Sequence, residues 1–241
     1  MSTLCDRFGD IQDRIAAAAQ RSARHAAAVQ LVAVSKSHPP ELLREAIEAG
    51  VVVFGENRIQ EARMKIPLLS NSVRWHFIGH LQSNKVRQAL PLFELLHGVD
   101  SLSIARDIDR IAGELGLHPK VLLEVNVAGE GTKFGFTPDA LRRQIEELVQ
   151  LGRLEIAGLM AIPPPAPEAE DSRRYFVRLR ELRDVLQDDA RIGLPDLSMG
   201  MSGDFEVAVE EGATMVRVGS ALFGERSGKQ WRPVGTDFLD A

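Results

Sequence analysis

Short apolar segments alternate with amphipathic helical segments along nearly all of the 241 residues of this chain. Segments with the composition of buried strands lie at residues 31–35, 51–54, 75–78, 95–99, 121–127, 156–162, 197–199 and 215–218. Helical patterns separate them at residues 40–49, 59–69, 84–89, 104–115, 138–151, 172–186 and 205–211, and another helix is expected before the first strand at residues 8–28. This alternation predicts an α/β protein with parallel strands.

Strand and helix repeating about eight times without a change of composition favours a single (β/α)8 barrel, the TIM-barrel architecture, over an open doubly wound sheet. An open sheet of that kind usually binds a nucleotide through a glycine-rich turn after its first strand, whereas that turn here reads Ser-Lys-Ser-His. We therefore expect one domain over residues 1–241, with an N-terminal helical segment at 1–30 and a C-terminal tail at 227–241.

Charge and composition argue against several classes of function. The formal net charge of −5 and the charged fraction of 26%, without a basic block, argue against nucleic acid as a partner. No apolar run approaches the roughly 18 residues of a membrane span, and the first residues lack a signal peptide's basic-then-apolar order, so we expect a cytoplasmic protein without a membrane partner. The single cysteine, Cys5, excludes an internal disulfide and a cysteine-rich metal site.

Lys36 is the most informative single residue, because it directly follows the apolar segment 31–35 at the expected rim of the barrel. Burying an ammonium group is costly unless a partner compensates or the proton is lost. A neutral amine there is a nucleophile that can attack a carbonyl and form an imine. The alternative is a lysine whose ammonium group extends from the strand end into water.

Two turns near the end of the chain have the composition of a phosphate-binding site. One turn, residues 200–203, contains Ser202, and the other contains Gly219 and Ser220 after the last strand. Glycines let a ligand approach the backbone closely, and the serine hydroxyls add donors. Barrels of this type frequently bind phosphate at these loops.

Three charged residues beside these turns are open to more than one interpretation. The carboxylates of Asp204 and Glu206 would repel a phosphate, so we expect them to serve the start of the following helix. Arg217 alternates with Val216 and Val218 along the last strand, which predicts that it points into the barrel. There it could contact a ligand or form an ion pair, for example with Glu124.

Other polar features carry weaker signals. His76 and His80 have the spacing of a helix but lie in a strand context, where they need not converge on a metal ion, and we expect no metal site. Lys133 lies in a glycine-rich loop, where it is either solvated or near an anionic ligand. The proline-rich and acidic segment 163–171 is expected to form a mobile surface loop.

The combination of Lys36 with the two glycine- and serine-containing turns resembles the pyridoxal 5′-phosphate (PLP) barrel that forms the N-terminal domain of alanine racemase. The resemblance is closer to the single-domain pyridoxal phosphate homeostasis protein family. The segments that carry it appear in order over nearly the whole chain, at residues 33–36, 54–57, 75–85, 158–162, 197–202 and 216–224. Together they are highly specific, although each segment alone is not.

The resemblance implies a role for each of several residues. Lys36 would form the imine (Schiff base) with PLP, Arg217 would face the pyridine nitrogen, and Asn57 and Met199 would line the pocket. The phosphate would be bound by Ser202, Gly219 and Ser220. His38 replaces a second lysine that some relatives have at this position.

The resemblance also favours a carrier over an enzyme. A permanently cationic Arg217 disfavours protonation of the pyridine nitrogen, which weakens the ring as an electron sink. The acid/base group that alanine racemase takes from a second domain has no counterpart here, and Tyr175 is a poor substitute. We therefore expect a monomeric protein of vitamin B6 metabolism that carries or buffers PLP and passes it to PLP-dependent apoenzymes.

Two enzyme functions remain as alternatives. One is a PLP-dependent amino-acid racemase or decarboxylase of unknown substrate, in which Lys36 itself would serve as the base. The other is a cofactor-free class I aldolase that uses Lys36 as its imine nucleophile.

Overall fold

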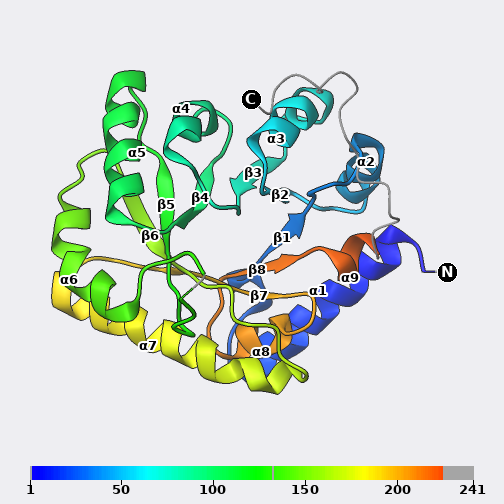
Figure 1. Ribbon diagram of the computed structural model, residues 1–241. Helices are drawn as coiled ribbons and strands as arrows, with labels where there is room; N and C mark the ends of the chain where they lie inside the picture. The colour runs from blue at the N-terminus through cyan, green and yellow to red at the C-terminus, as the bar shows by residue number, and fades with distance from the viewer. Residues whose placement is uncertain (1, 132, 225–241) are drawn as a thin grey trace.

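The computed structural model describes residues 2–131 and 133–224, and within this part of the chain parallel strands close into a barrel (Figure 1). The strands are β1 (Gln30–Val34), β2 (Val53–Glu56), β3 (Arg74–Phe77), β4 (Leu95–Val99), β5 (Lys120–Glu124), β6 (Glu155–Met160), β7 (Asp196–Met201) and β8 (Met215–Val218). Each strand pairs with the next along the chain, and β8 pairs with β1 to close the sheet. The predicted (β/α)8 barrel is confirmed.

Helices connect the strands on the outside of the barrel. They are α1 (Leu4–Arg21), α2 (Pro40–Glu48), α3 (Ile59–Lys65), α4 (Val86–Ala89), α5 (Leu102–Leu115), α6 (Pro138–Val149), α7 (Arg173–Ala190), α8 (Phe205–Glu210) and α9 (Ser220–Phe223). Short 3₁₀ turns lie at Ala26–Ala28, Ile66–Leu68, Ser83–Lys85 and Ala169–Ser172. No helix of the described residues is long and apolar enough to cross a membrane.

Local sequence signals explain where several of these helices begin and end. The side chains of Ser101 and Thr137 accept hydrogen bonds from the first turns of α5 and α6, as N-cap residues do. Pro40 occupies the first position of α2, where its missing N–H costs nothing. Gly116 ends α5 with φ of 69°, a conformation that glycine adopts without strain.

Alternation along the strands divides the core into two layers. In β1, Leu31 and Ala33 belong to the large cluster that packs the sheet against the helices, whereas Val32 belongs to a smaller cluster inside the barrel. Strand side chains alternate between the two faces of a sheet, so a closed barrel has a filled interior and a covered exterior. The small inner cluster consists of Val32, Val53, Leu95, Leu122, Ala157, Met160 and Met215.

The N-terminal helix is shorter than its sequence pattern predicts. We expected a helix over residues 8–28, but α1 spans Leu4–Arg21 and the chain turns at Ala23, which has φ of 54°. Arg24 then donates to the carbonyl oxygens of Val209 (2.8 Å) and Ala213 (2.9 Å). These hydrogen bonds hold the chain against the end of α8. Tertiary contacts therefore override the helix propensity of the alanine-rich residues that follow Arg21.

Other predicted boundaries also differ from the structure. The strand predicted at 121–127 ends at Glu124, and the strand predicted at 51–54 is found at Val53–Glu56. Part of the loop predicted at 163–171 is the 3₁₀ turn Ala169–Ser172. The predicted tail at 227–241 lies outside the described residues.

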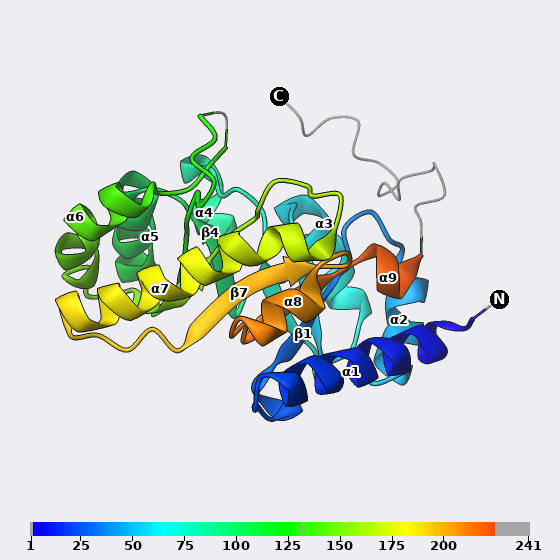
Figure 2. The same cartoon turned by 90° about the horizontal axis from the view of Figure 1, so that it is seen from below.

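Helix α1 packs along α8 and α9 on one side of the barrel, as both views show (Figures 1 and 2). Arg14 of α1 pairs with Glu206 of α8 at 2.9 Å, and Arg21 pairs with Glu210 at 2.6 Å. The N-terminal segment therefore supports the two helices that follow β7 and β8. Those strands carry the serine- and glycine-containing turns of the site described next.

Candidate functional site

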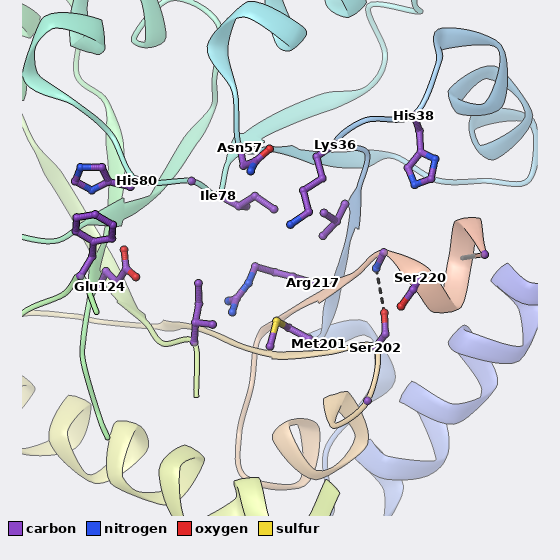
Figure 3. Close-up of a pocket in the computed structure, with 17 residues that line it drawn as sticks. Lys36, His38, Asn57, Ile78, His80, Glu124, Met201, Ser202, Arg217 and Ser220 are labelled. Carbon is purple, nitrogen blue, oxygen red and sulfur yellow. Dashed lines mark hydrogen bonds between the residues drawn. The ribbon is translucent and has the colours of Figure 1, made fainter. Parts of the chain in front are cut away.

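A cavity of about 490 Å³ opens where the C-terminal ends of the strands meet (Figure 3). This is the end of a (β/α)8 barrel at which active sites are found. Of the seven site residues expected from the sequence, the structure brings six together on its lining: Lys36, Asn57, Ser202, Arg217, Gly219 and Ser220.

Met199 lies elsewhere, which corrects its expected place in the lining. Its side chain is fully buried in the cluster between sheet and helices, and Met201 lines the cavity instead. Met199 follows the alternation along β7, because its neighbour Ser198 faces the barrel interior, whereas Met201 reaches the cavity because the register of β7 against β8 shifts between Ser198 and Met201. Gly200 permits the shift with φ of 91°, and a Cβ at this position would lie 2.5 Å from the side chain of Ala208.

Lys36 lies in the turn that follows β1, and its side chain extends into the cavity near Arg217 (Figure 3). The residue is only partly exposed. Its neighbour Ser37 has φ of 65°, so the chain bends sharply at this point. This placement disfavours the alternative of an ammonium group that extends into bulk water.

Asn57 follows β2 and lies against the backbone of Gly79, which follows β3. A Cβ on Gly79 would come within 2.6 Å of the carbonyl oxygen of Asn57, closer than real contacts allow. Only glycine therefore lets these two strand ends approach each other as they do.

The two turns with the composition of a phosphate site lie side by side. The hydroxyl oxygen of Ser202 accepts hydrogen bonds from the backbone N–H groups of Gly219 (3.2 Å) and Ala221 (3.3 Å) (Figure 3). Gly203 also lines the cavity, and a Cβ built on it would meet no heavy atom within 4 Å. The two turns are therefore joined, and they present the hydroxyls of Ser202 and Ser220 and an open floor to a ligand.

The two carboxylates beside these turns have other partners, although the side chain of Asp204 does not cap the first turn of α8 as expected. Asp204 accepts a hydrogen bond from the backbone N–H of Met201 at 2.7 Å, which closes its own turn. Glu206 pairs with Arg14 of α1. Both acidic groups are thus occupied by contacts that stabilise the turn and the helix behind it.

Arg217 is buried and points inward from β8, as the alternation along this strand predicts. Among the described residues its guanidinium donates to the hydroxyl of Ser198 (2.6 Å) and the carbonyl oxygen of Ala161 (2.9 Å), rather than forming the suggested ion pair with Glu124. Burial lowers the pKa of Arg217 to about 10, so the group remains cationic at neutral pH.

A chain of buried polar side chains continues from Arg217 across the barrel interior. Ser198 lies 2.9 Å from Nδ1 of His97, and Nε2 of His97 lies 3.0 Å from Nδ1 of His76. Burial lowers the pKa of His76 to about 3 and that of His97 well below its ordinary value, so both rings are neutral. Arg217 donates to the Ser198 hydroxyl, and the tautomers of the two histidine rings set the direction of the remaining two hydrogen bonds.

The sequence interpretation missed this chain. It considered His76 only as a metal ligand, placed Ser198 only among the polar residues at the end of its strand, and did not consider His97. The available signal was the same alternation that placed Arg217, because each residue is a polar position on the inner face of its strand. His80 instead pairs with Asp100 at 2.7 Å, and the described residues contain no group of three or more ligands that could hold a metal ion.

Acidic and aromatic side chains form the end of the cavity opposite the serine turns (Figure 3). The ring of His80 stacks on Phe134 with centroids 3.8 Å apart. Glu124 is nearly buried there, and burial, with the nearby charge of Asp100, raises its pKa to about 7. Lys133 pairs with Glu130 at 2.8 Å and is not among the residues that line the cavity.

We expect Glu124 to make the stability of the folded protein depend on pH. Its pKa is about 7 in the folded protein against an ordinary value of 4.5, so the protonated carboxyl favours folding below about pH 4.5 and this contribution is lost as the pH rises through about 7. At 1.36 kcal/mol per pKa unit, the loss amounts to roughly 3 kcal/mol. The Glu124→Gln variant, which has no carboxyl group to titrate at this position, should lack this loss of stability.

Urea unfolding of both proteins at about pH 5 and about pH 8 measures the difference. The variant should become more stable relative to the parent protein at the higher pH. Parallel pH profiles for the two proteins would contradict the raised pKa.

The chain matches the family model of the alanine racemase N-terminal domain over residues 11–227. The pyridoxal phosphate homeostasis protein of Aquifex aeolicus is 45% identical over 223 residues, which cover 92% of this chain and 98% of that protein. The protein of the same name from Pseudomonas aeruginosa is 46% identical over 228 residues, or 94% and 97% of the two chains.

Solved structures of similar fold include that of a PLP-binding protein and that of an alanine racemase. PipY of Synechococcus elongatus, determined with PLP bound, is 41% identical with a TM-score of 0.81, over 92% of this chain and all of that one. An alanine racemase from Clostridium difficile is 18% identical with a TM-score of 0.65, over 85% of this chain and 55% of that one. The second likeness concerns the fold alone.

Proposed function

We propose a function from the finding that this chain belongs to the pyridoxal phosphate homeostasis protein family. The protein binds PLP as a reversible imine on Lys36, and it carries or buffers this reactive aldehyde. One observation carries the proposal. A lysine, a buried arginine and two joined serine- and glycine-containing turns line the same cavity. We propose further that residues 1–241 form a single PLP-binding domain, since the family match covers residues 11–227.

The residues on the cavity fit the chemical groups of PLP. The Lys36 amine suits the aldehyde, and the cationic Arg217 suits the pyridine nitrogen as a hydrogen-bond acceptor. Ser202, Gly219 and Ser220 suit the phosphate, whose oxygens accept hydrogen bonds from hydroxyl and backbone donors. Asn57 also lines the cavity. The structure of PipY with PLP bound supports PLP as the ligand.

The proposed binding step is a reversible condensation. The neutral Lys36 amine attacks the aldehyde carbon of PLP, and one water molecule leaves as the carbon–nitrogen double bond forms. Adding water reverses the step and releases the aldehyde. A cytoplasmic carrier of this kind, acting as a monomer, would deliver PLP to apoenzymes that lack it.

Arg217 favours a carrier over an enzyme. Its guanidinium stays charged at neutral pH, and a cation beside the pyridine nitrogen opposes the protonation that makes PLP an electron sink. Tyr175 lies on α7 and is not among the residues that line the cavity. The competing candidate, a PLP-dependent enzyme, is favoured by Glu124, whose pKa of about 7 suits acid–base chemistry.

Loading the purified protein with PLP, reducing it with borohydride and mapping the modified peptide tests the proposal. We expect the label on Lys36, an imine absorption band before reduction, and no amino-acid racemisation or decarboxylation above the rate of free PLP. Turnover well above that rate would replace the carrier with the enzyme. Reduction that requires an added carbonyl substrate, without PLP, would indicate an aldolase.

A further inference from the structure

A fully buried ionic cluster lies behind the Lys36 turn and outside the lining of the cavity. Lys65 of α3 pairs with Glu56 at the end of β2 (2.7 Å) and with Glu61 of α3 (2.9 Å). The side chains of Lys65 and Glu56 are completely buried, and that of Glu61 is 7% exposed. Removing three ionisable groups from water is costly, and neither the barrel fold nor the proposed ligand contacts require it.

The cluster holds both residues that flank Lys36. The Lys65 ammonium donates to the carbonyl oxygen of Ser35 at 2.9 Å, and the Ser35 hydroxyl donates to Glu56 at 2.8 Å. On the other side, the backbone N–H of Ser37 donates to Glu61 at 2.8 Å. Bonds that involve an ionised group are stronger and more directional than neutral ones, so each of these contacts restrains the turn.

The turn needs such restraint because it is strained and leaves the sheet. Ser37 adopts φ of 65°, a conformation that a residue with a side chain adopts at a cost. The backbone N–H of Ser35 donates to the carbonyl oxygen of Gly55 at 3.0 Å, although β1 ends at Val34, and Lys36 lies beyond this last contact with the sheet. The position of the Lys36 backbone therefore depends largely on the hydrogen bonds that hold Ser35 and Ser37.

We propose that Glu56, Glu61 and Lys65 are positioning residues that aim the Lys36 amine at the aldehyde of PLP. This inference rests on the proposed function, since it concerns the same lysine. Imine formation requires the amine nitrogen to approach the carbonyl carbon along a restricted direction, and small displacements slow such reactions strongly. The cluster touches neither the ring nor the phosphate site, so its loss should affect the covalent step far more than ligand capture.

Two mild variants test the proposal with two probes. Ser35→Ala removes one hydroxyl contact to Glu56, and Glu61→Gln keeps the shape of the side chain but removes its charge. The rate of imine formation with PLP is measured by its absorption band. Noncovalent affinity is measured with pyridoxine 5′-phosphate, which has an alcohol in place of the aldehyde and cannot form the imine.

Both variants should form the imine about tenfold more slowly, with unchanged affinity for pyridoxine 5′-phosphate. Thr214→Val is the control, because it also removes a hydrogen bond from a hydroxyl to a carboxylate, here the part-buried bond to Asp196, and Thr214 does not line the cavity. It should keep the parent rate. If Glu61→Gln fails to fold, Ser35→Ala carries the same comparison.

Parent rates in both variants would overturn the proposal. Rate and analogue affinity falling together would also overturn it, because they would indicate general disruption of the site. A parent protein that binds PLP without any imine would refute the proposed function itself, which is a distinguishable result.

Discussion

Replacement of Lys36 by alanine is expected to abolish the imine absorption band of the PLP-loaded protein and to weaken PLP binding by at least about tenfold. Lys36 is the lysine that the structure places on the cavity within the described residues. The variant keeps Arg217 and the turns that contain Ser202 and Gly219. It should therefore retain noncovalent binding of the ring and the phosphate.

Visible spectroscopy and equilibrium dialysis measure the two effects separately. Lys120→Ala is a suitable control, because Lys120 pairs with Asp196 at 3.1 Å and does not line the cavity. That variant should keep the band and the parent affinity. A Lys36→Ala protein that still shows the band would mean that another amine carries the ligand.

Unchanged affinity of Lys36→Ala for pyridoxine 5′-phosphate would show that the lost binding is covalent. If the analogue is lost together with PLP, the substitution has damaged the cavity, and the role assigned to the amine would lose its support.

Alternation of strands and helices was sufficient to predict the barrel, because a parallel strand needs a crossover connection before the next one. The same alternation within β8 placed Arg217 inside the barrel. It does not predict that Met201 reaches the cavity, because Gly200 and the register shift of β7 interrupt the period of two after Met199. A sequence pattern shows a period but does not show where backbone geometry breaks it.

The buried polar groups were harder to predict than the residues on the cavity. Lys65 lies in the helical segment 59–69, and a lysine in a helix is usually solvated. Its burial depends on Glu56, which comes from a different element, and on the carbonyl oxygen of Ser35. Contacts of this kind depend on how β1, β2 and α3 pack together, and a local pattern of residue types contains no such information.

Lys65→Met should be among the most destabilising single changes in the described part of this protein. The methionine has a similar volume, but it leaves Glu56 and Glu61 buried without their counter-ion, and breaking a buried pair in this way costs about 3–5 kcal/mol. Burial already raises the pKa of Glu56. Losing the ammonium raises the pKa of Glu56 further, so the variant should regain stability relative to the parent as the pH falls.

The triple variant Lys65→Met, Glu56→Gln and Glu61→Gln separates stability from positioning. Without buried charges it should recover most of the lost free energy of unfolding, measured in urea, because neutral replacement of a buried ion pair is often tolerated. Imine formation should nevertheless remain slow, since the carbonyl oxygen of Ser35 and the N–H of Ser37 no longer face charged partners. A triple variant that is stable and reacts with PLP at the parent rate would show that the cluster serves the fold alone.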